Sequence, residues 1–446
     1  MARSRTMNMT EGSPIRLLAV FALPLLIGNL FQQAYNIADS VIVGQFIGAG
    51  ALAAVGATGS VTFLFFSVCN GISSGGGIVT AQYFGAQDHG KVKRAIANSA
   101  YIMFATTLTM GALAFALTPT VLRLMGTPAD ILPDAITYMR MSCVSVPLIG
   151  VYNYSASMLR ALGDSRTPLI FLVVSCFLNV CMDLIFVRVF HLGVFGAALA
   201  TMLAQMIAGI GCLVFALRTN PYFMLSREER AFDRQIAGHA VRLGLPLALQ
   251  WSMIAISTTA LQRVVNGFGT AAVAAFTATT RVEQLTQQPF GSLSMALSTY
   301  SGQNFGAKRL DRVRLGLRDS MLAMGAFSLA MLGIMQLLGG RIIAVFVSDP
   351  EVIALGGRAI RITSWFYAFL GTIYMTRGTL NGVGDAMFSF INGLIEMLCR
   401  IFLPMGMMLI PSVGVWAIWW TAGLTWAVSA LFCVLRYLWW KRKHVQ

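Results

Sequence analysis

Charged residues are scarce in this chain, and acidic residues are the scarcest among them. Of 446 residues, 11% are charged, with 17 acids against 32 bases, and 57% are hydrophobic. Soluble domains carry about 25% charged residues. The mean hydropathy of +0.72 points the same way. This composition excludes a soluble enzyme, a secreted disulfide scaffold and a disordered chain, and it indicates that lipid surrounds most of the sequence.

Motifs for metal, disulfides or nucleotides are also missing. The four histidines lie far apart, and the seven cysteines fall in apolar stretches without a CxxC pair, as expected for small packed side chains. The glycine-rich run at 71–77 lacks the Lys-Ser/Thr of a phosphate loop, so we interpret it as a helix-packing surface. We expect no cofactor, and we attribute the net charge of +15 to membrane orientation rather than to nucleic acid.

Twelve apolar runs are long enough to cross a bilayer as helices, since about 20 residues suffice. The runs are 15–43, 51–81, 95–118, 133–159, 168–188, 193–217, 237–261, 271–300, 319–339, 352–380, 387–410 and 414–438. With the N-terminus in the cytoplasm, the cytoplasmic gaps hold 23 of the 32 lysines and arginines, against six on the opposite side. We therefore predict an all-α, multi-pass protein of the cell (inner or plasma) membrane with both termini cytoplasmic.

The chain repeats itself after 221 residues. The stretch QYFGA at 82–86 returns as QNFGA at 303–307, and a Gly-Asp pair follows the same period from 163 to 384. An even number of spans in each half makes the halves parallel, with the substrate path expected at their interface. We predict two pseudo-symmetric six-helix bundles.

The expected domains are an N-terminal lobe at 1–217, a cytoplasmic linker at 218–236 and a C-terminal lobe at 237–446. Within the linker, Ser226 and Glu229 have the spacing of a capping box, which predicts a short basic amphipathic helix.

These features resemble the multidrug and toxic compound extrusion (MATE) family. The resemblance rests on the two halves, on GQNFGA at 302–307 with its counterpart at 82–86, and on the Gly-Asp pairs. The phrase YNIAD at 35–39 resembles the bacterial branch related to the DNA-damage-inducible type. The resemblance implies a V-shaped pair of bundles and a transporter rather than an enzyme. It also implies an antiporter that exports cationic or amphipathic small molecules in exchange for H⁺ and/or Na⁺ by alternating access. We expect a monomer whose partners are such organic cations and membrane lipids, with no nucleic acid.

Four acids lie within the predicted spans, namely Asp39, Asp183, Glu283 and Glu396. A charge at bilayer depth costs about 2.5–3.5 kcal/mol on insertion scales, so each acid is a candidate functional group. None of the positions 221 residues away is acidic. A structural need common to both halves therefore does not explain these acids.

The first half brings polar residues of three spans to one depth. Asp39, Asp183 and Thr201 lie about 9, 8 and 12 Å from the outer ends of their helices, and Asn179 stands one turn before Asp183. Such a set can share a proton, or Asp39, Asn179 and Asp183 can coordinate Na⁺. Asp39, Asn179, Asp183 and Thr201 match the N-lobe cation site of the family, and Tyr138 matches a neighbouring residue. The alternative is a static hydrogen-bond cluster.

The second half lacks acids in the spans at 237–261 and 352–380, where some family members hold a C-lobe Na⁺ site. This departure favours the N-lobe as the coupling centre. Glu396 and Arg400 are four residues apart and are predicted to neutralise each other. Glu283 is interpreted either as a counter-charge for a cationic substrate or as the partner of an arginine on another helix.

A central substrate cavity is expected to have polar side chains from both halves, and Pro24 is the expected hinge. The cavity candidates are Gln33, Tyr35, Asn36, Glu283, Gln284 and Gln287. A flippase for lipid-linked saccharides or other lipids is the alternative function. An intramembrane enzyme and a channel are less favoured, because no catalytic constellation and no selectivity loop is visible.

Overall fold

The computed structural model describes residues 6–410 and 412–444, which form helices joined by turns and loops and contain no strand. Residues 1–5, 411 and 445–446 of the predicted domains lie outside this part. The α-helices are α1 (Pro14–Phe46), α2 (Ala49–Gly85), α3 (His89–Leu124), α4 (Leu132–Ala161), α5 (Arg166–Asp183), α6 (Gly193–Thr219), α7 (Arg234–Asn266), α8 (Thr270–Gly306), α9 (Leu310–Ala344), α10 (Pro350–Ser364), α11 (Tyr367–Gly382), α12 (Ala386–Met408) and α13 (Ala417–His444). A π-helix at Leu184–Val189 continues α5. The all-α prediction is confirmed.

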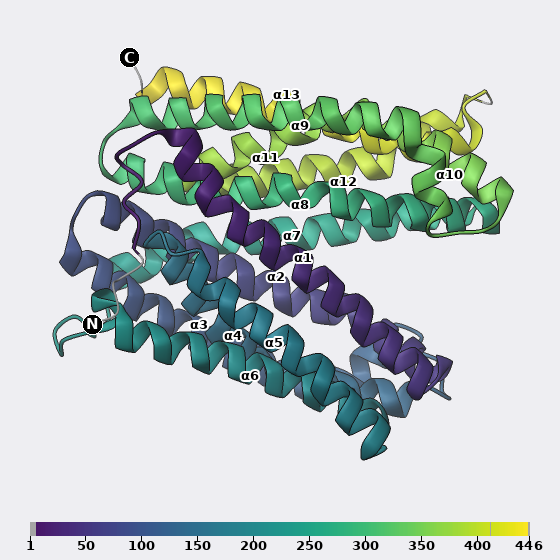
Figure 1. The fold of residues 1–446 in the computed structure, drawn as a ribbon, viewed down its shortest axis with the longest axis horizontal. Helices are drawn as coiled ribbons and strands as arrows, with labels where there is room; N and C mark the ends of the chain where they lie inside the picture. Colours follow the sequence, from purple (N-terminus) through teal and green to yellow (C-terminus); the bar gives the residue numbers. More distant parts are fainter. Residues whose placement is uncertain (1–5, 411, 445–446) are drawn as a thin grey trace. The chain divides into compact units, whose positions relative to one another are not determined.

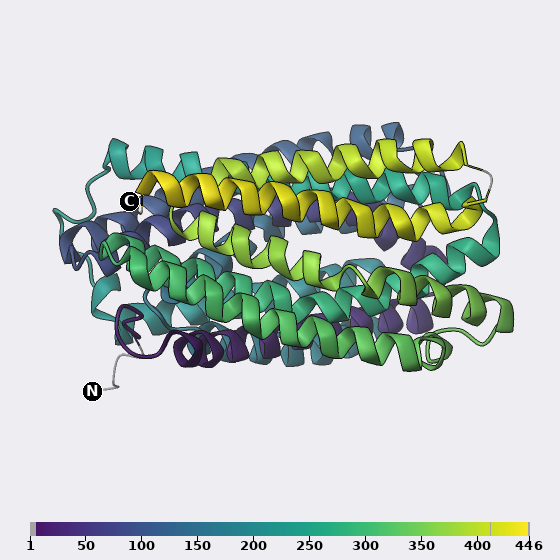
Figure 2. The ribbon, with the colours of Figure 1, turned by 90° about the horizontal axis from the view of Figure 1, so that it is seen from above.

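The helices group into two compact units. The first comprises Met1–Met9 and Phe21–Ala248, and the second comprises Thr10–Val20 and Leu249–Gln446. In the first unit α4 packs against α2, α3 and α6, and in the second α11 packs against α8, α9 and α13. Within each unit the long helices run side by side (Figure 1; Figure 2). In this grouping 237–248 fall in the first unit and 10–20 in the second; the predicted domain boundaries at 217 and 237 stay a prediction.

In the part of the chain that the structure describes, ten helices are long and apolar enough to cross a membrane. A further predicted span, 271–300, corresponds to the 37-residue α8, a more polar helix that contains Pro289. The unbroken span predicted at 352–380 is wrong, because α10 ends at Ser364 and α11 begins at Tyr367. Aromatic packing accompanies this break: the ring of Phe366 covers Gly423 of α13, and Tyr367 is buried.

The backbone keeps the 221-residue period. Residues with positive φ recur in pairs at this spacing, Gly48 with Gly269, Gln87 with Lys308, Gly163 with Gly384 and Gly193 with Gly414. Helices α2 and α8 have equal lengths of 37 residues. The two halves thus share both their helices and the turns that connect them, which confirms the predicted duplication.

The glycine run at 71–77 is a packing surface, as predicted. A Cβ atom on Gly71 would lie 2.4 Å from the backbone nitrogen of Ala248, and one on Gly75 would lie 2.4 Å from the carbonyl oxygen of Ala240. Both contacts join α2 to the first half of α7 within the first unit. Only glycine allows the two backbones to approach so closely.

The linker after α6 differs from the prediction. The capping-box contacts form, because the Ser226 N–H donates to Glu229 Oε2 at 2.7 Å and the Glu229 N–H donates to Ser226 Oγ at 3.3 Å. The residues that follow make turns, however, so the predicted amphipathic helix is wrong. The segment instead packs on α3, where Lys93 pairs with Glu229 at 3.2 Å and Asn98 accepts from the Asp233 N–H at 2.9 Å. These contacts hold the linker in a turn conformation.

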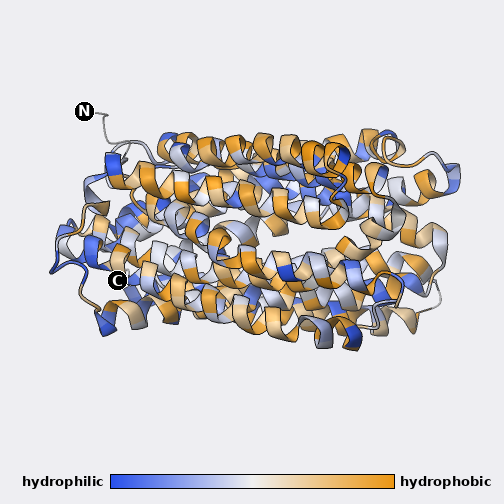
Figure 3. Ribbon diagram, turned by 90° about the horizontal axis from the view of Figure 1, so that it is seen from below, coloured by the Kyte–Doolittle hydropathy of each residue, from blue (hydrophilic) through white to orange (hydrophobic). Residues whose placement is uncertain are grey.

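Hydrophobic residues cover most of the length of the helices, and hydrophilic residues gather at their ends and in the loops (Figure 3). Large apolar side chains point outward, among them Leu337 at 84% exposure and Phe177 at 70%. Such surfaces are stable in lipid rather than in water. The chain is a multi-pass membrane protein.

Candidate functional site

Two carboxyl groups meet in the first unit. Asp39 lies in the second half of α1, and Asp183 is the last residue of α5, where that helix passes into the π-helix Leu184–Val189. Single π-turns occur frequently at functional sites. The side chains of the two acids lie close enough to interact directly, and Asp183 is fully buried. The structure thus brings these two residues together, and their coupling role stays a prediction.

An amide connects this pair to the next helix. Asn179, one turn before Asp183 and 1% exposed, takes the orientation in which its nitrogen donates to Asp183 Oδ2 at 2.9 Å and its oxygen accepts from the Thr201 N–H at 3.2 Å. The opposite orientation would place the amide oxygen against a carboxylate. α1, α5 and α6 therefore contribute to one polar cluster.

Two tyrosines complete this cluster. Tyr35 lies near Thr201, and Tyr35 and Tyr138 both lie near the two acids. Tyr35 thus belongs to this cluster, and its expected place in a substrate cavity stays a prediction. Its position one turn before Asp39 on the same helix face was the signal in the sequence.

Each acid retains one buried oxygen atom without a donor. In the described part of the chain, neither Oδ1 of Asp39 nor Oδ1 of Asp183 has a hydrogen-bond donor. A buried carboxylate oxygen is costly unless a proton, a cation or a donor satisfies it. Two such atoms on neighbouring acids form a site that can take up positive charge.

The second unit contains a separate polar cluster. Glu283 of α8 lies near Thr363 of α10 and Arg400 of α12, and Arg400 donates to Ser257 Oγ of α7 at 3.1 Å. Sequence reasoning found Glu283 but missed Thr363 and Ser257. Their partners lie on other helices, so no local spacing indicates them.

Glu396 does not pair with Arg400, so that prediction is wrong. Its Oε1 lies 2.7 Å from Nη1 of Arg377 in α11, and both side chains are at most 10% exposed. Arg377 is buried within its helix. The pair forms because α11 and α12 pack together, and this contact outweighs the spacing along α12.

The remaining cavity candidates divide between the units. Gln33 and Asn36 lie on α1 in the first unit, whereas Gln284 and Gln287 lie on α8 in the second. The Tyr374 hydroxyl donates to Gln287 Oε1 at 3.3 Å. A cavity shared by these residues stays a prediction.

Pro24 is buried inside the continuous helix α1. It lies shortly after Val20 and Phe21, where α1 passes from one unit to the other. Its hinge role stays a prediction.

Comparison with known proteins gives consistent matches. The family model described as MatE matches residues 24–185 and 246–405. The "Probable multidrug resistance protein YpnP" of Bacillus subtilis is 27% identical over 392 residues, which are 87% of each chain. The "Probable multidrug resistance protein NorM" of Thermotoga maritima is 26% identical over 82% of this chain and 79% of the relative.

Solved structures share the fold. One described as the "Outward-facing conformation of a multidrug resistance MATE family transporter of the MOP superfamily" has a TM-score of 0.93 at 21% identity and covers all of both chains. Another, "Crystal structure of MATE in the bent conformation", has a TM-score of 0.92 at 22% identity and covers 98% of both chains.

Proposed function

Because the chain belongs to the MatE family of membrane transporters, we propose that it is a secondary active antiporter for multidrug efflux. In this proposal it exports cationic or amphipathic small molecules by alternating access, in exchange for H⁺ or Na⁺. The relatives named as multidrug resistance proteins support the substrate class. The coupling site is the polar cluster around Asp39 and Asp183.

The contact between these two acids carries the proposal. Two carboxyl groups in direct contact share a proton, because two adjacent like charges are unfavourable. Their buried Oδ1 atoms have no donor in the described residues. The pair therefore gains or loses positive charge at modest cost, as a coupling site requires.

The polar atoms around the pair support H⁺ more directly than Na⁺. A Na⁺ ion is a hard cation that requires several oxygen ligands. Asn179 presents its nitrogen, a donor, to Asp183, so a bound Na⁺ would need the amide to turn over. The hydrogen bonds of this cluster are compatible with a proton as they stand.

Loading and release of the cation would move α1 relative to α5 and α6. A proton on the acid pair removes a buried charge, and its loss restores that charge and the desolvation cost. Pro24 lacks the N–H of a helical hydrogen bond, so α1 bends there most readily. Glu283 of the second unit supplies the negative charge for a cationic substrate.

The test uses purified protein in proteoliposomes loaded with a fluorescent organic cation, with ΔpH and Na⁺ gradients imposed separately. We expect Asp39→Asn and Asp183→Asn to lower gradient-driven efflux to the level of empty vesicles. Asp134→Asn is the matched control, because it makes the same change at an exposed acid in the first turn of α4. Efflux that persists in Asp39→Asn would refute the coupling site, and lipid translocation without any gradient response would favour a flippase.

A further inference from the structure

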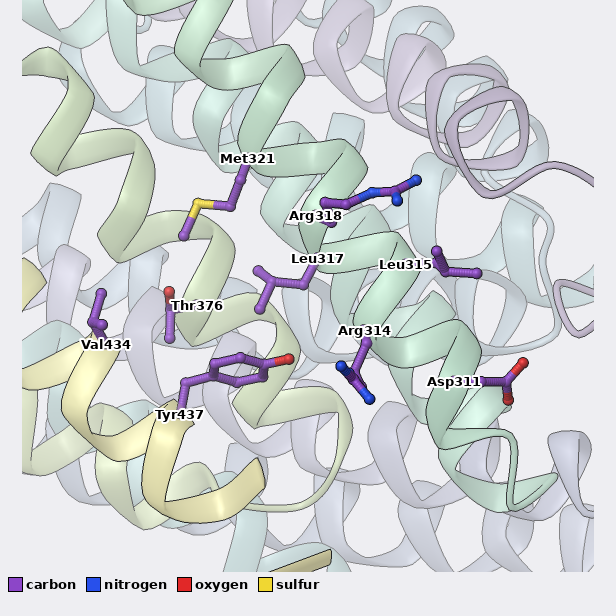
Figure 4. Close-up of a pocket in the computed structure, with 9 residues that line it drawn as sticks. All are labelled: Asp311, Arg314, Leu315, Leu317, Arg318, Met321, Thr376, Val434 and Tyr437. Atoms are coloured by element: carbon purple, nitrogen blue, oxygen red, sulfur yellow. The ribbon is translucent and has the colours of Figure 1, made fainter. Parts of the chain in front are cut away.

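A groove lies in the second unit between α9, α11 and α13, and it is lined by none of the residues of the two polar clusters. Its volume is about 590 Å³, within the roughly 300–1,000 Å³ of small-ligand sites. Leu317 and Met321 of α9 form one wall, Val434 and Tyr437 of α13 form the other, and Thr376 of α11 lies between them (Figure 4). α9 and α13 both pack on α11, so the groove follows that helix.

One end of this groove has a positive charge. Arg314 of α9 is exposed, has no ion-pair partner in the described residues, and extends toward the Tyr437 hydroxyl (Figure 4). The neighbouring Arg318 turns outward and pairs with Asp319 at 3.0 Å. The carboxylate of Asp311 points away from Tyr437 (Figure 4). Arg314 is therefore the cation available to a ligand in the groove.

The depth of Arg314 matches that of a lipid headgroup. It lies four residues after the start of α9, about 6 Å along the helix axis. Tyr437 lies in the last two turns of α13, and tyrosine is enriched at the membrane–water interface. Lys441 follows Tyr437 by one turn and adds a second positive charge on the same face of α13.

The rest of the groove suits an acyl chain. Leu317, Met321 and Val434 are apolar, and the surfaces that continue from them expose Leu322 at 67% and Leu431 at 58%. A chain lying there would replace contacts that the bilayer otherwise makes with these side chains. Basic pockets between transmembrane helices bind the headgroups of anionic lipids.

We propose that the groove between α9, α11 and α13 binds one anionic phospholipid. Arg314 pairs with the phosphate, the Tyr437 hydroxyl donates to it, and an acyl chain lies against Leu317 and Val434. The lipid belongs to the leaflet at the end where α9 begins and α13 ends. Its binding joins three helices of the second unit and stabilises that unit.

The experiment measures lipid binding to the delipidated full chain in detergent by native mass spectrometry. The probes are phosphatidylglycerol, phosphatidylcholine and inorganic phosphate. We expect the parent to prefer phosphatidylglycerol, and Arg314→Gln to reduce that preference about fivefold, as for the loss of one basic contact near the membrane surface. Arg314→Lys should retain most of it. Arg341→Gln is the matched control, because Arg341 is exposed in the last turn of the same helix.

A second variant tests the acyl-chain part of the groove. In Val434→Trp the larger side chain fills the groove from its α13 wall and should weaken binding of both lipids. Thermal unfolding is measured to confirm that the variant folds. Equal binding of both lipids to the parent would overturn the proposal. So would an Arg314→Gln variant that keeps its preference, an equal loss in Arg341→Gln, or inorganic phosphate that competes fully with the lipid.

Discussion

The ion pair between Arg377 and Glu396 offers a sharp test of the second unit. Their atoms Nη1 and Oε1 are 2.7 Å apart, and the side chains are 10% and 7% exposed. Removing one partner of a buried pair leaves an uncompensated charge and costs about 3–5 kcal/mol. We therefore expect Glu396→Gln to destabilise the protein by this amount, which corresponds to a fall in Tm of roughly 3–5 °C for a chain of this length.

The double variant separates charge from packing. Replacing both members of a buried pair by uncharged groups of similar size is often neutral or stabilising. Arg377→Met/Glu396→Gln should therefore recover most of the stability that Glu396→Gln loses. A double-mutant cycle then gives the coupling energy of the pair.

The assay is thermal unfolding of the purified protein in detergent, with Glu228→Gln as the control at an exposed acid. That control should change Tm by no more than a degree or two, as surface substitutions usually do. A Glu396→Gln variant with the Tm of the parent would refute the reasoning. So would a double variant no more stable than the single one.

Two further tests address packing and pH in the first unit. Gly75→Ala places a Cβ atom against Gly244, whose backbone nitrogen would lie 2.4 Å away, whereas a Cβ atom on Gly59 would have nothing within 4 Å. Gly75→Ala should therefore lower the free energy of unfolding by about 1–3 kcal/mol. Gly59→Ala is the control and should leave Tm nearly unchanged. An equal effect of the two variants would contradict the packing role. Hydrogen bonds from the Ser226 backbone and from Lys93 lower the pKa of Glu229. The docking of the linker on α3 is therefore at full strength above about pH 4.5, and it weakens as the pH falls through the lowered pKa. Amide hydrogen exchange in the linker, corrected for its intrinsic pH dependence, should become faster in acid. In Glu229→Gln the exchange should be fast at every pH. Slow exchange in that variant would contradict the role of the carboxylate.

The sequence by itself determined the features that follow from local pattern. Long apolar runs with few charges require helices in lipid, because only intrahelical hydrogen bonds satisfy the backbone there. The 221-residue period identified the duplication, and the positive-φ turns repeat it. The spacing of Asn179 and Asp183, together with the depth of Asp39, predicted the acid cluster, because position along a helix fixes height and face.

Only the tertiary structure decided which side chains meet across helices. Glu396 pairs with Arg377 rather than with its neighbour Arg400, and Arg400 donates to Ser257 of α7. The break between α10 and α11 and the assignment of 237–248 to the first unit were likewise invisible in the sequence. The physical reason is that partner choice depends on how each helix rotates and packs against its neighbours, and periodicity along one helix does not contain that information.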